Sequence, residues 1–446
     1  MVDRSDDASC LLGLAGLAVV RVVLTGLGVK IVQLVTDDPE AARCPGCAVV
    51  STSAKEWTLT RPRDLPVGGR QVVLLWRKQR WRCRTLGCPR TSFTEQLPQV
   101  PARMRTTTRL RAALAVAVED GRDQCEVAAT YRVSWPTVRR AVVARGVVEL
   151  IEPQPVRVLG MDETRFGRPR WLPDGHHEDG RVRWRRTDPW ETGFVDIIGE
   201  QGLWGQVDAP TSAAVAAWLA ARSQEFRDAV EVVVIDPHAG YAEAVHAALA
   251  HALLAVDHFH LVMLANEQGP HRRAPARDPR AVGRRGRAID PAWANPRLLL
   301  RGRERLSPAA LARMWNGCVD HDPSARILTA GIAKESLREL CATAAAGGHR
   351  EDINRRLWGF YTWCADAEVP ELTTLAETID TCWPAVEVSL TTGLSNARTE
   401  GTNRLIKQVK RAARGFRNRE NYRRRVRLHR TRHTRRLSAR KPTVPA

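Results

Sequence analysis

The sequence predicts an α/β protein in which a mixed sheet, flanked by helices and interrupted by a helical insertion, follows two small N-terminal domains. Three observations predict this order. Two close pairs of cysteines lie in a β-rich N-terminal stretch, three short helical patterns follow them, and apolar strands alternate with helices after Pro155. At 446 residues the chain is long enough for several domains with at least one sizeable core.

The charge balance indicates a polyanionic partner. Lys and Arg number 69 against 49 Asp and Glu, which gives a formal net charge of +20. Such a surplus attracts polyanions, so nucleic acid is the first candidate partner and a membrane surface the second. The surplus is concentrated between Arg404 and Lys441, where Glu420 is the only acid. The alternative interpretation of that basic run is a solvated tail.

The apolar stretch 11–35 predicts early strands of a soluble domain. Arg21 and Lys30 interrupt it, so no uncharged run approaches the roughly 20 residues that span a bilayer. No basic n-region precedes it, and Asp3, Asp6 and Asp7 have the wrong sign for a signal peptide. We therefore expect a cytoplasmic protein with no membrane partner.

Four cysteines within residues 1–100 have the spacing of a structural zinc site. They form one C-x2-C pair and one C-x4-C pair: Cys44 with Cys47, and Cys83 with Cys88. Two short turns of this kind present four thiolates tetrahedrally to one Zn²⁺. Between the pairs, the segment 64–83 predicts two strands joined at Gly68–Gly69, which suits a zinc ribbon. The alternative is four free buried cysteines.

Residues 101–150 predict a helix-turn-helix DNA-binding domain. Helical patterns cover 110–119, 125–131 and 135–145, and Ser134 is the expected N-cap of the third helix. In that geometry the third helix enters the major groove of DNA. The side chains expected to contact DNA are Trp135, Thr137, Arg139, Arg140 and Arg145. The alternative is a plain helical hairpin, because the pattern is loose.

Residues 155–269 predict the first part of the α/β domain. Expected strands cover 156–164, 191–200, 203–210, 231–236 and 253–257, with an expanded loop over 167–190 that extends a hairpin towards DNA. Runs of β-branched residues such as "EVVVID" are typical of buried strands. The remaining segments are a mainly helical insertion at 270–390, the last helix of the domain at 391–415, and a basic C-terminal tail at 416–446.

Three acids have positions that indicate a metal site. Asp162 lies on the first strand, Asp236 ends a buried strand, and Glu400 lies near the start of a basic helix. Strand ends of one sheet lie together, and three convergent carboxylates suit a pair of Mg²⁺ ions. Two such ions assist phosphodiester cleavage. The alternatives are turn capping by the aspartates and an i,i+4 ion pair of Glu400 with Arg404.

The chain resembles bacterial insertion-sequence transposases of the ISL-three family, which combine a zinc ribbon, a helix-turn-helix and an RNase H-like DDE catalytic domain. The similarity lies in the cysteine pairs with "TSFTEQLP", then in "GMDET", "AVDHFHLVMLAN" and "RLLLRGRERLS", and above all in "SNARTEGTNRLIKQVKRAARGFRNRENYRRRV". It implies that Asp162, Asp236 and Glu400 are the catalytic triad, with Asp257 as the alternative second ligand. It also implies that the four cysteines bind zinc.

The resemblance implies a nucleoid-associated DNA transposase that binds the terminal inverted repeats of its element and catalyses DNA cleavage and strand transfer. Two Mg²⁺, or Mn²⁺ in their place, and one structural Zn²⁺ are the expected cofactors. The expected partners are terminal repeats, target DNA and further copies of the chain, in a DNA-bound homodimer or larger assembly. DNA phosphates are expected to contact Arg404, Lys407, Lys410 and Arg411.

Two other functions remain open at this point. The first is a non-catalytic DNA-binding regulator, domesticated or decayed from such a transposase. The second is a structure-selective nuclease that has the same core but performs no transposition.

Overall fold

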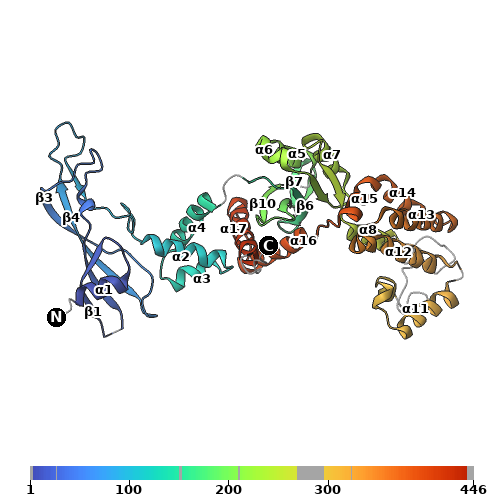
Figure 1. Ribbon diagram of the computed structural model, residues 1–446, viewed down its shortest axis with the longest axis horizontal. Coiled ribbons are helices and arrows are strands. Elements are labelled where there is room, and N and C mark those ends of the chain that lie inside the picture. The colour runs from blue at the N-terminus through green and yellow to red at the C-terminus, as the bar shows by residue number, and fades with distance from the viewer. Residues whose placement is uncertain are drawn as a thin grey trace. The chain divides into compact units, whose positions relative to one another are not determined.

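The computed structural model describes residues 4–26, 28–149, 153–208, 211–268, 296–322 and 324–438, and it divides into two compact units (Figure 1). The first unit contains residues 1–151 and 408–429, and the second contains 152–407 and 430–446. The chain therefore returns to its N-terminal unit near its C-terminus. Within the described residues, no helix is both long and apolar enough to cross a membrane.

The first unit begins with a five-stranded sheet in the order β1-β2-β4-β3, with β5 beside β4. β2 and β4 are parallel, whereas the other pairs are antiparallel. Trp76, Leu34 and Leu74 are fully buried at its core. The elements are α1 (Arg4–Leu12), β1 (Leu17–Leu24), β2 (Lys30–Thr36), β3 (Ala54–Thr60), β4 (Val72–Arg82) and β5 (Ser92–Thr94).

The two strands that we predicted between the cysteine pairs are only partly present. Gly68 and Gly69 form the expected turn, at φ values of 59° and 71°, and isolated antiparallel bridges join Val67 to Arg70 and Arg63 to Val73, but residues 64–67 form no continuous strand. The ladders of β4 are with β2, β3 and β5. The physical reason lies in the flanking residues: prolines 62 and 66 lack the backbone donor that a ladder needs. In addition, the buried Asp64 accepts hydrogen bonds from Thr107 and Arg109.

The three helices of the predicted helix-turn-helix are present. They are α2 (Thr108–Glu119), α3 (Gln124–Thr130) and α4 (Trp135–Glu149). Thr107 caps α2 and Asp123 caps α3 through their side-chain oxygens, which satisfies backbone donors at each helix start. Leu114, Val127 and Val138, one from each helix, are buried in a shared core.

Much of the segment that we predicted as a basic tail is a helix, α17 (Arg419–Ser438). In the first unit, its residues Tyr422 and Val426 are buried, and Leu428 joins the core of the helix-turn-helix. Arg425 donates to the backbone carbonyls of residues 121 and 122, at 3.4 and 2.7 Å. The apolar i,i+4 spacing within the arginine run accounts for this packing. Residues 439–446 lie outside the described part of the chain.

The second unit contains a five-stranded mixed sheet in the order β10-β9-β6-β11-β12. β6, β11 and β12 run parallel, β9 is antiparallel to β6, and β10 is antiparallel to β9. This confirms the predicted RNase H-like α/β class. The strands are β6 (Val158–Arg165), β9 (Trp190–Asp196), β10 (Leu203–Asp208), β11 (Val232–Ile235) and β12 (Leu253–Val256).

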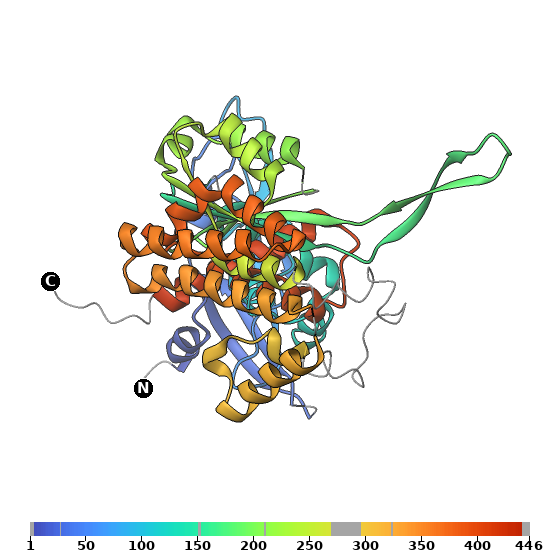
Figure 2. The same cartoon turned by 90° about the vertical axis from the view of Figure 1, so that its right-hand side faces the viewer.

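An antiparallel hairpin projects from this sheet between β6 and β9 (Figure 2). It consists of β7 (Arg170–His176) and β8 (Val182–Thr187), in the loop that the sequence indicated as expanded. Nearly all of its side chains are exposed, including Trp171 and Trp184. That the hairpin reaches towards DNA stays a prediction.

Alternate residues of the central strands face two different helical layers. Val233 and Ile235 of β11 belong to a large core with α5 and α7, whereas Val232 and Val234 pack near the C-terminal part of α15. Apart from those at 296–381, the helices that begin in this unit are α5 (Ser212–Ala220), α6 (Gln224–Ala229), α7 (Ala239–Ala248), α8 (His258–Gln268), α15 (Trp383–Thr392), which overlaps the end of the predicted insertion, and α16 (Ala397–Ala412).

The described part of the predicted insertion is helical and shares the large core of the sheet. Leu337, Phe360 and Leu375, from three of its helices, are buried in that core. Residues 269–295 lie outside the described residues. The helices are α10 (Pro296–Leu299), α11 (Pro308–His321), α12 (Arg326–Ala342), α13 (Arg350–Asp366) and α14 (Pro370–Thr381).

Gly160 of β6 permits the close approach of α16 to the sheet. A Cβ atom at this position would lie 2.4 Å from Ile197 Cδ1 and 2.4 Å from Thr399 Oγ1. Neither atom belongs to a flexible surface side chain, because Ile197 and Thr399 are both buried. The close packing of α16 against β6 therefore requires a glycine at position 160.

We expect Gly160→Ala to lower the free energy of unfolding by about 1–3 kcal/mol, since the added methyl overpacks this contact. The matched control is Gly401→Ala on α16, where an added Cβ meets no atom within 4 Å. It should leave stability unchanged or raise it by up to about 1 kcal/mol. Denaturant unfolding followed by circular dichroism measures both, and equal stability of Gly160→Ala and wild type would refute the contact's importance.

Candidate active site

Three aspartates lie at one level of three neighbouring parallel strands. The pairing of Val234 with Gly160, and of Ile235 with Val256, places Asp236 level with both Asp162 and Asp257. Side chains alternate between the two faces of a strand. All three aspartates therefore share a face with Val158, Val234 and Ala255, which is the face that packs near α15 and the start of α16.

Helix α16 presents a polar face to these aspartates. Asn396 donates from Nδ2 to Asp236 Oδ1 at 3.1 Å and to the Met161 carbonyl at 3.2 Å. Asn403 donates from Nδ2 to Asp162 Oδ2 at 2.6 Å. Glu400 lies between the two asparagines at i,i+4 and i,i+3 spacing, so it occupies the same helix face.

His260 on α8 completes the group. Its Nδ1 lies 3.2 Å from Asp236 Oδ1 and 3.3 Å from Asp257 Oδ2. One ligand atom each of Asp257, His260 and Glu400 lies within 4.8 Å of the others. The fold thus brings Glu400 close to Asp257 and His260, and His260 close to Asp236.

A cavity of about 350 Å³ opens at this cluster. Its lining combines acids with two histidines and an indole: Asp162, Glu163, Trp190, Asp236, His238, His260 and Glu267, together with Pro237, Met263 and Leu264. A space of this size is within the range of ligand-binding pockets.

Burial makes ionisation of the two central aspartates unfavourable. Burial, reinforced by the neighbouring Asp236 carboxylate, raises the pKa of Asp162 to about 7. Burial likewise raises the pKa of Asp236, although the nearby His260 opposes the shift. The pKa of Asp257 is lowered: burial acts against this, but the hydrogen bond with His260 prevails. A bound cation would relieve the cost of holding these carboxylates ionised together.

The alternative reason for an acid at position 400 was an i,i+4 ion pair with Arg404. Among the described residues, Glu400 makes no ion pair with Arg404, which lies one turn further along α16 and is exposed. Lys407 and Arg411 are also exposed, whereas Lys410 is half-buried. The position of Glu400 towards the acid cluster therefore needs another reason.

The residues of α4 that we expected to contact DNA differ in their surroundings. Trp135, Arg139 and Arg140 are exposed, and Thr137 is half-buried with its hydroxyl 2.9 Å from that of Ser134. Arg139 lies over the Trp135 ring, 5.9 Å from its centroid.

Arg145 has a structural partner instead. Its Nε donates to the buried carboxylate of Glu119 on α2 at 3.1 Å. Leaving a buried carboxylate without a partner is costly, so this ion pair accounts for Arg145 without DNA.

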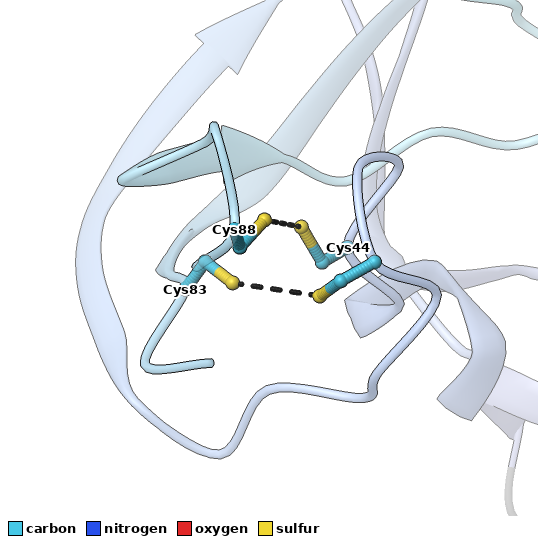
Figure 3. A group of neighbouring side chains, drawn as sticks. Cys44, Cys83 and Cys88 are labelled. Carbon is cyan, nitrogen blue, oxygen red and sulfur yellow. Dashed lines mark hydrogen bonds between the residues drawn. The ribbon is translucent and has the colours of Figure 1, made fainter. Parts of the chain in front are cut away.

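The four cysteines form one cluster in the first unit (Figure 3). The Sγ atoms of Cys44 and Cys88 are 3.8 Å apart, those of Cys47 and Cys83 are 3.7 Å apart, and all four lie within 4.8 Å of one another. Hydrogen bonding with Thr85 lowers the pKa of Cys47 to about 6, which favours the thiolate that zinc requires. Four convergent sulfurs fit a closed structural zinc site.

Three polar residues of the acid cluster were not predicted as site residues from the sequence. His260 had a local signal, because Asp257 and His260 are spaced i,i+3 at the start of a helix. Asn396 and Asn403 flank Glu400 on one helix face, in "SNARTEGTN". Of the two candidates for the second ligand, Asp236 and Asp257, the structure brings both into the cluster.

Family models match the chain in three consecutive stretches. A zinc-finger model of transposases IS204, IS1001, IS1096 and IS1165 matches residues 40–88, and a helix-turn-helix model of transposase family ISL3 matches residues 95–146. The ISL3 DDE model, described as a transposase, matches residues 182–426, more than half of the chain. That stretch contains Asp236, Asp257 and Glu400, whereas Asp162 precedes it.

Individual proteins are also similar to this chain. The transposase for insertion sequence element IS1001 of Bordetella parapertussis is 26% identical over 383 residues, which cover 84% of this chain and 86% of that protein. Among solved structures, the Drosophila P element transposase strand transfer complex matches 75% of this chain and 92% of its own, with 11% identity and a TM-score of 0.39. From the extent of the DDE model match, the chain belongs to the ISL3 family of transposases.

Proposed function

We propose that this DNA transposase binds the terminal inverted repeats of its own insertion sequence, cuts the DNA there by metal-dependent hydrolysis, and joins the freed ends to target DNA. The proposal rests on one observation above all. In a chain with a net charge of +20, Asp162, Asp236 and His260 line one cavity, and His260 also lies in a group of ligand atoms with Asp257 and Glu400.

The proposed metal ligands are Asp162, Asp236 and Glu400. The family implies a divalent metal, and a set of carboxylate oxygens suits Mg²⁺, or Mn²⁺ in its place. When bound, two such ions activate the attacking oxygen and stabilise the leaving one. The protein's own contribution is to fix the carboxylates: Asn403 holds Asp162, and Asn396 holds Asp236.

The second ligand is better assigned to Asp236 than to Asp257. His260 lies within hydrogen-bonding distance of both aspartates, but the pKa of Asp257 is lowered by this contact, whereas burial keeps the pKa of Asp236 raised. Asp236 pairs in register with the strand that bears Asp162, and its carboxylate raises the pKa of Asp162. We therefore assign Asp257 and His260 to positioning, beside the metal ligands.

The DNA contacts that we propose come from three elements. The zinc ribbon and α4 recognise the terminal repeat, with Trp135, Arg139 and Arg140 exposed for the purpose. The exposed Arg404, Lys407 and Arg411 of α16 contact DNA phosphates. Because two DNA ends must be brought together before strand transfer, the proposed active form is a homodimer or larger assembly on DNA.

The acid cluster predicts the outcome of charge-neutralising substitutions. Asp162→Asn, Asp236→Asn and Glu400→Gln should each reduce excision of a marker flanked by the native ends by at least about a hundredfold, because each removes a metal ligand. Asp257→Asn should retain more excision than Asp236→Asn. The control is Glu225→Gln, which alters an exposed acid on α6. Excision at the wild-type level by any of the three variants would refute the triad.

Metal binding should be visible without activity. Mg²⁺ or Mn²⁺ should raise the melting temperature of wild type and of Glu225→Gln, but not of Asp236→Asn, because only a native-state site stabilises by mass action. A shift of equal size in Asp236→Asn would contradict the assignment.

This metal effect should depend on pH. Because the folded-state pKa of Asp162 is raised to about 7, its stabilising contribution in chelator is complete below its unfolded pKa of about 4 and is lost as the pH rises through 7. A bound cation favours the ionised form and offsets this loss. The gap between melting temperatures in metal and in chelator should therefore widen from pH 6 to pH 8. A constant gap would argue against Asp162 as a ligand.

The cysteine cluster predicts one zinc per chain by elemental analysis of the purified protein. Cys83→Ser should lose that zinc and destabilise the N-terminal sheet, since structural zinc contributes folding free energy. Cys125→Ser, at an exposed cysteine outside the cluster, should retain both. A folded N-terminal sheet in a zinc-free wild-type protein would disprove the structural role.

A further inference from the structure

A second cavity, of about 520 Å³, lies within the first unit and is lined by five arginines. They come from separate segments: Arg63 before the β4 strand, Arg103 and Arg105 in the link that precedes α2, Arg111 on α2, and Arg140 on α4. We call it the arginine cavity. Met104, Thr106, Val133, Ser134 and Thr137 complete its lining.

Backbone hydrogen bonds fix the link that contributes two of these arginines. The Arg63 N–H donates to the Arg105 carbonyl, and the Thr107 N–H donates to the Arg63 carbonyl, each at 2.9 Å. The neighbouring Asp64 is fully paired, with the Thr107 hydroxyl and the Arg109 guanidinium. The segments around residues 63 and 105 are thus held together at the start of α2, and their arginines cannot separate freely.

The positive charge of the arginine cavity is not compensated within the fold. No acid lines the cavity, and among the described residues none of its five arginines forms an ion pair. Other arginines of the same domain do so, as Arg122 does with Glu126. Burial lowers the pKa of Arg111, whose side chain donates to the Thr108 hydroxyl at 3.2 Å. The like charges that line the cavity repel one another, and a bound anion would relieve this repulsion.

The start of α4 adds uncharged donors to the same cavity. Ser134 and Thr137 line it, with their hydroxyls 2.9 Å apart. At the start of α4, a helix of 15 residues, Pro136 has no N–H and the Thr137 N–H donates to the Ser134 carbonyl at 2.9 Å, so the hydroxyls are the main uncharged donors. The positive end of the helix dipole favours an anion at this position. Guanidinium groups, hydroxyls and a helix N-terminus together are the chemistry that recognises a phosphate.

We propose that the arginine cavity binds backbone phosphates of the DNA whose major groove receives α4. The inference rests on the proposed function and adds a site to it: the link before α2 becomes part of the DNA interface. Contacts of this type fix the position of the domain on the duplex without reading its sequence. A free phosphate or nucleotide has the same chemistry and is the other possible source of the ligand.

The test uses the full-length protein and two fluorescent duplexes, one with the native terminal repeat and one with a scrambled sequence. Arg103→Gln/Arg105→Gln should weaken binding of both duplexes about tenfold or more, and should reduce the slope of log affinity against log salt by about two. Arg63→Gln/Arg111→Gln, from the other segments, should do the same. Zinc content and melting temperature establish that the variants are folded.

The matched control is Arg297→Gln/Arg313→Gln, which removes two exposed arginines of α10 and α11, outside the unit that contains the arginine cavity. It should leave affinity and salt slope near those of wild type. Unchanged DNA binding by both cavity variants would overturn the inference, and so would a loss confined to the native repeat, because that indicates base reading. If wild type does not prefer the native repeat over the scrambled duplex, the proposed function fails instead.

Pyrophosphate distinguishes the two sources of phosphate. If DNA occupies the cavity, millimolar pyrophosphate should compete with duplex binding of wild type and have less effect on the cavity variants. Binding of pyrophosphate that depends on these arginines, together with DNA affinity that does not, would overturn DNA as the ligand.

Discussion

The candidate active site in the second unit depends on the contact between α16 and β6. Gly160 leaves space for Thr399, and the asparagines on either side of Glu400 bond to Asp236 and Asp162. These hydrogen bonds connect residues 160 and 241 positions apart in the sequence. Without this contact Glu400 would be one acid on a basic surface helix, and the aspartates would lack the side chains that orient them.

Acidic and basic side chains occupy different regions of this protein. Acids cluster at strand ends beneath a helix, where burial raises the pKa of Asp162 and Asp236. The folded protein thus retains carboxylates that are unfavourable to ionise, as is common at functional sites. Uncompensated arginines gather on α4, on α16 and in the arginine cavity, where a polyanion would lower their mutual repulsion. The net charge of the chain therefore does not reveal that its acidic and basic side chains lie in separate regions.

Several arginines have partners within the fold. Arg145 pairs with the buried Glu119, Arg109 pairs with Asp64, and Arg425 donates to two carbonyls beside α3. Helix α17 is also rich in arginine, yet part of it packs into the fold, because its residues Tyr422 and Leu428 are buried. The surplus of basic residues predicted the kind of partner correctly, but it did not indicate which of them reach that partner.

The sequence by itself determined the features that depend on short-range patterns: the cysteine spacing, the three helices of the helix-turn-helix, and the acids that end apolar strands. Only the tertiary structure decided which strands pair, so that β4 forms its ladders with β2, β3 and β5 and only isolated bridges join residues 63–67 to residues 70–73. It also brought Asp257 and His260 to Glu400, and α17 to the helix-turn-helix. The physical reason is that pairing and packing are selected by residues distant in sequence, whose complementarity no local pattern records.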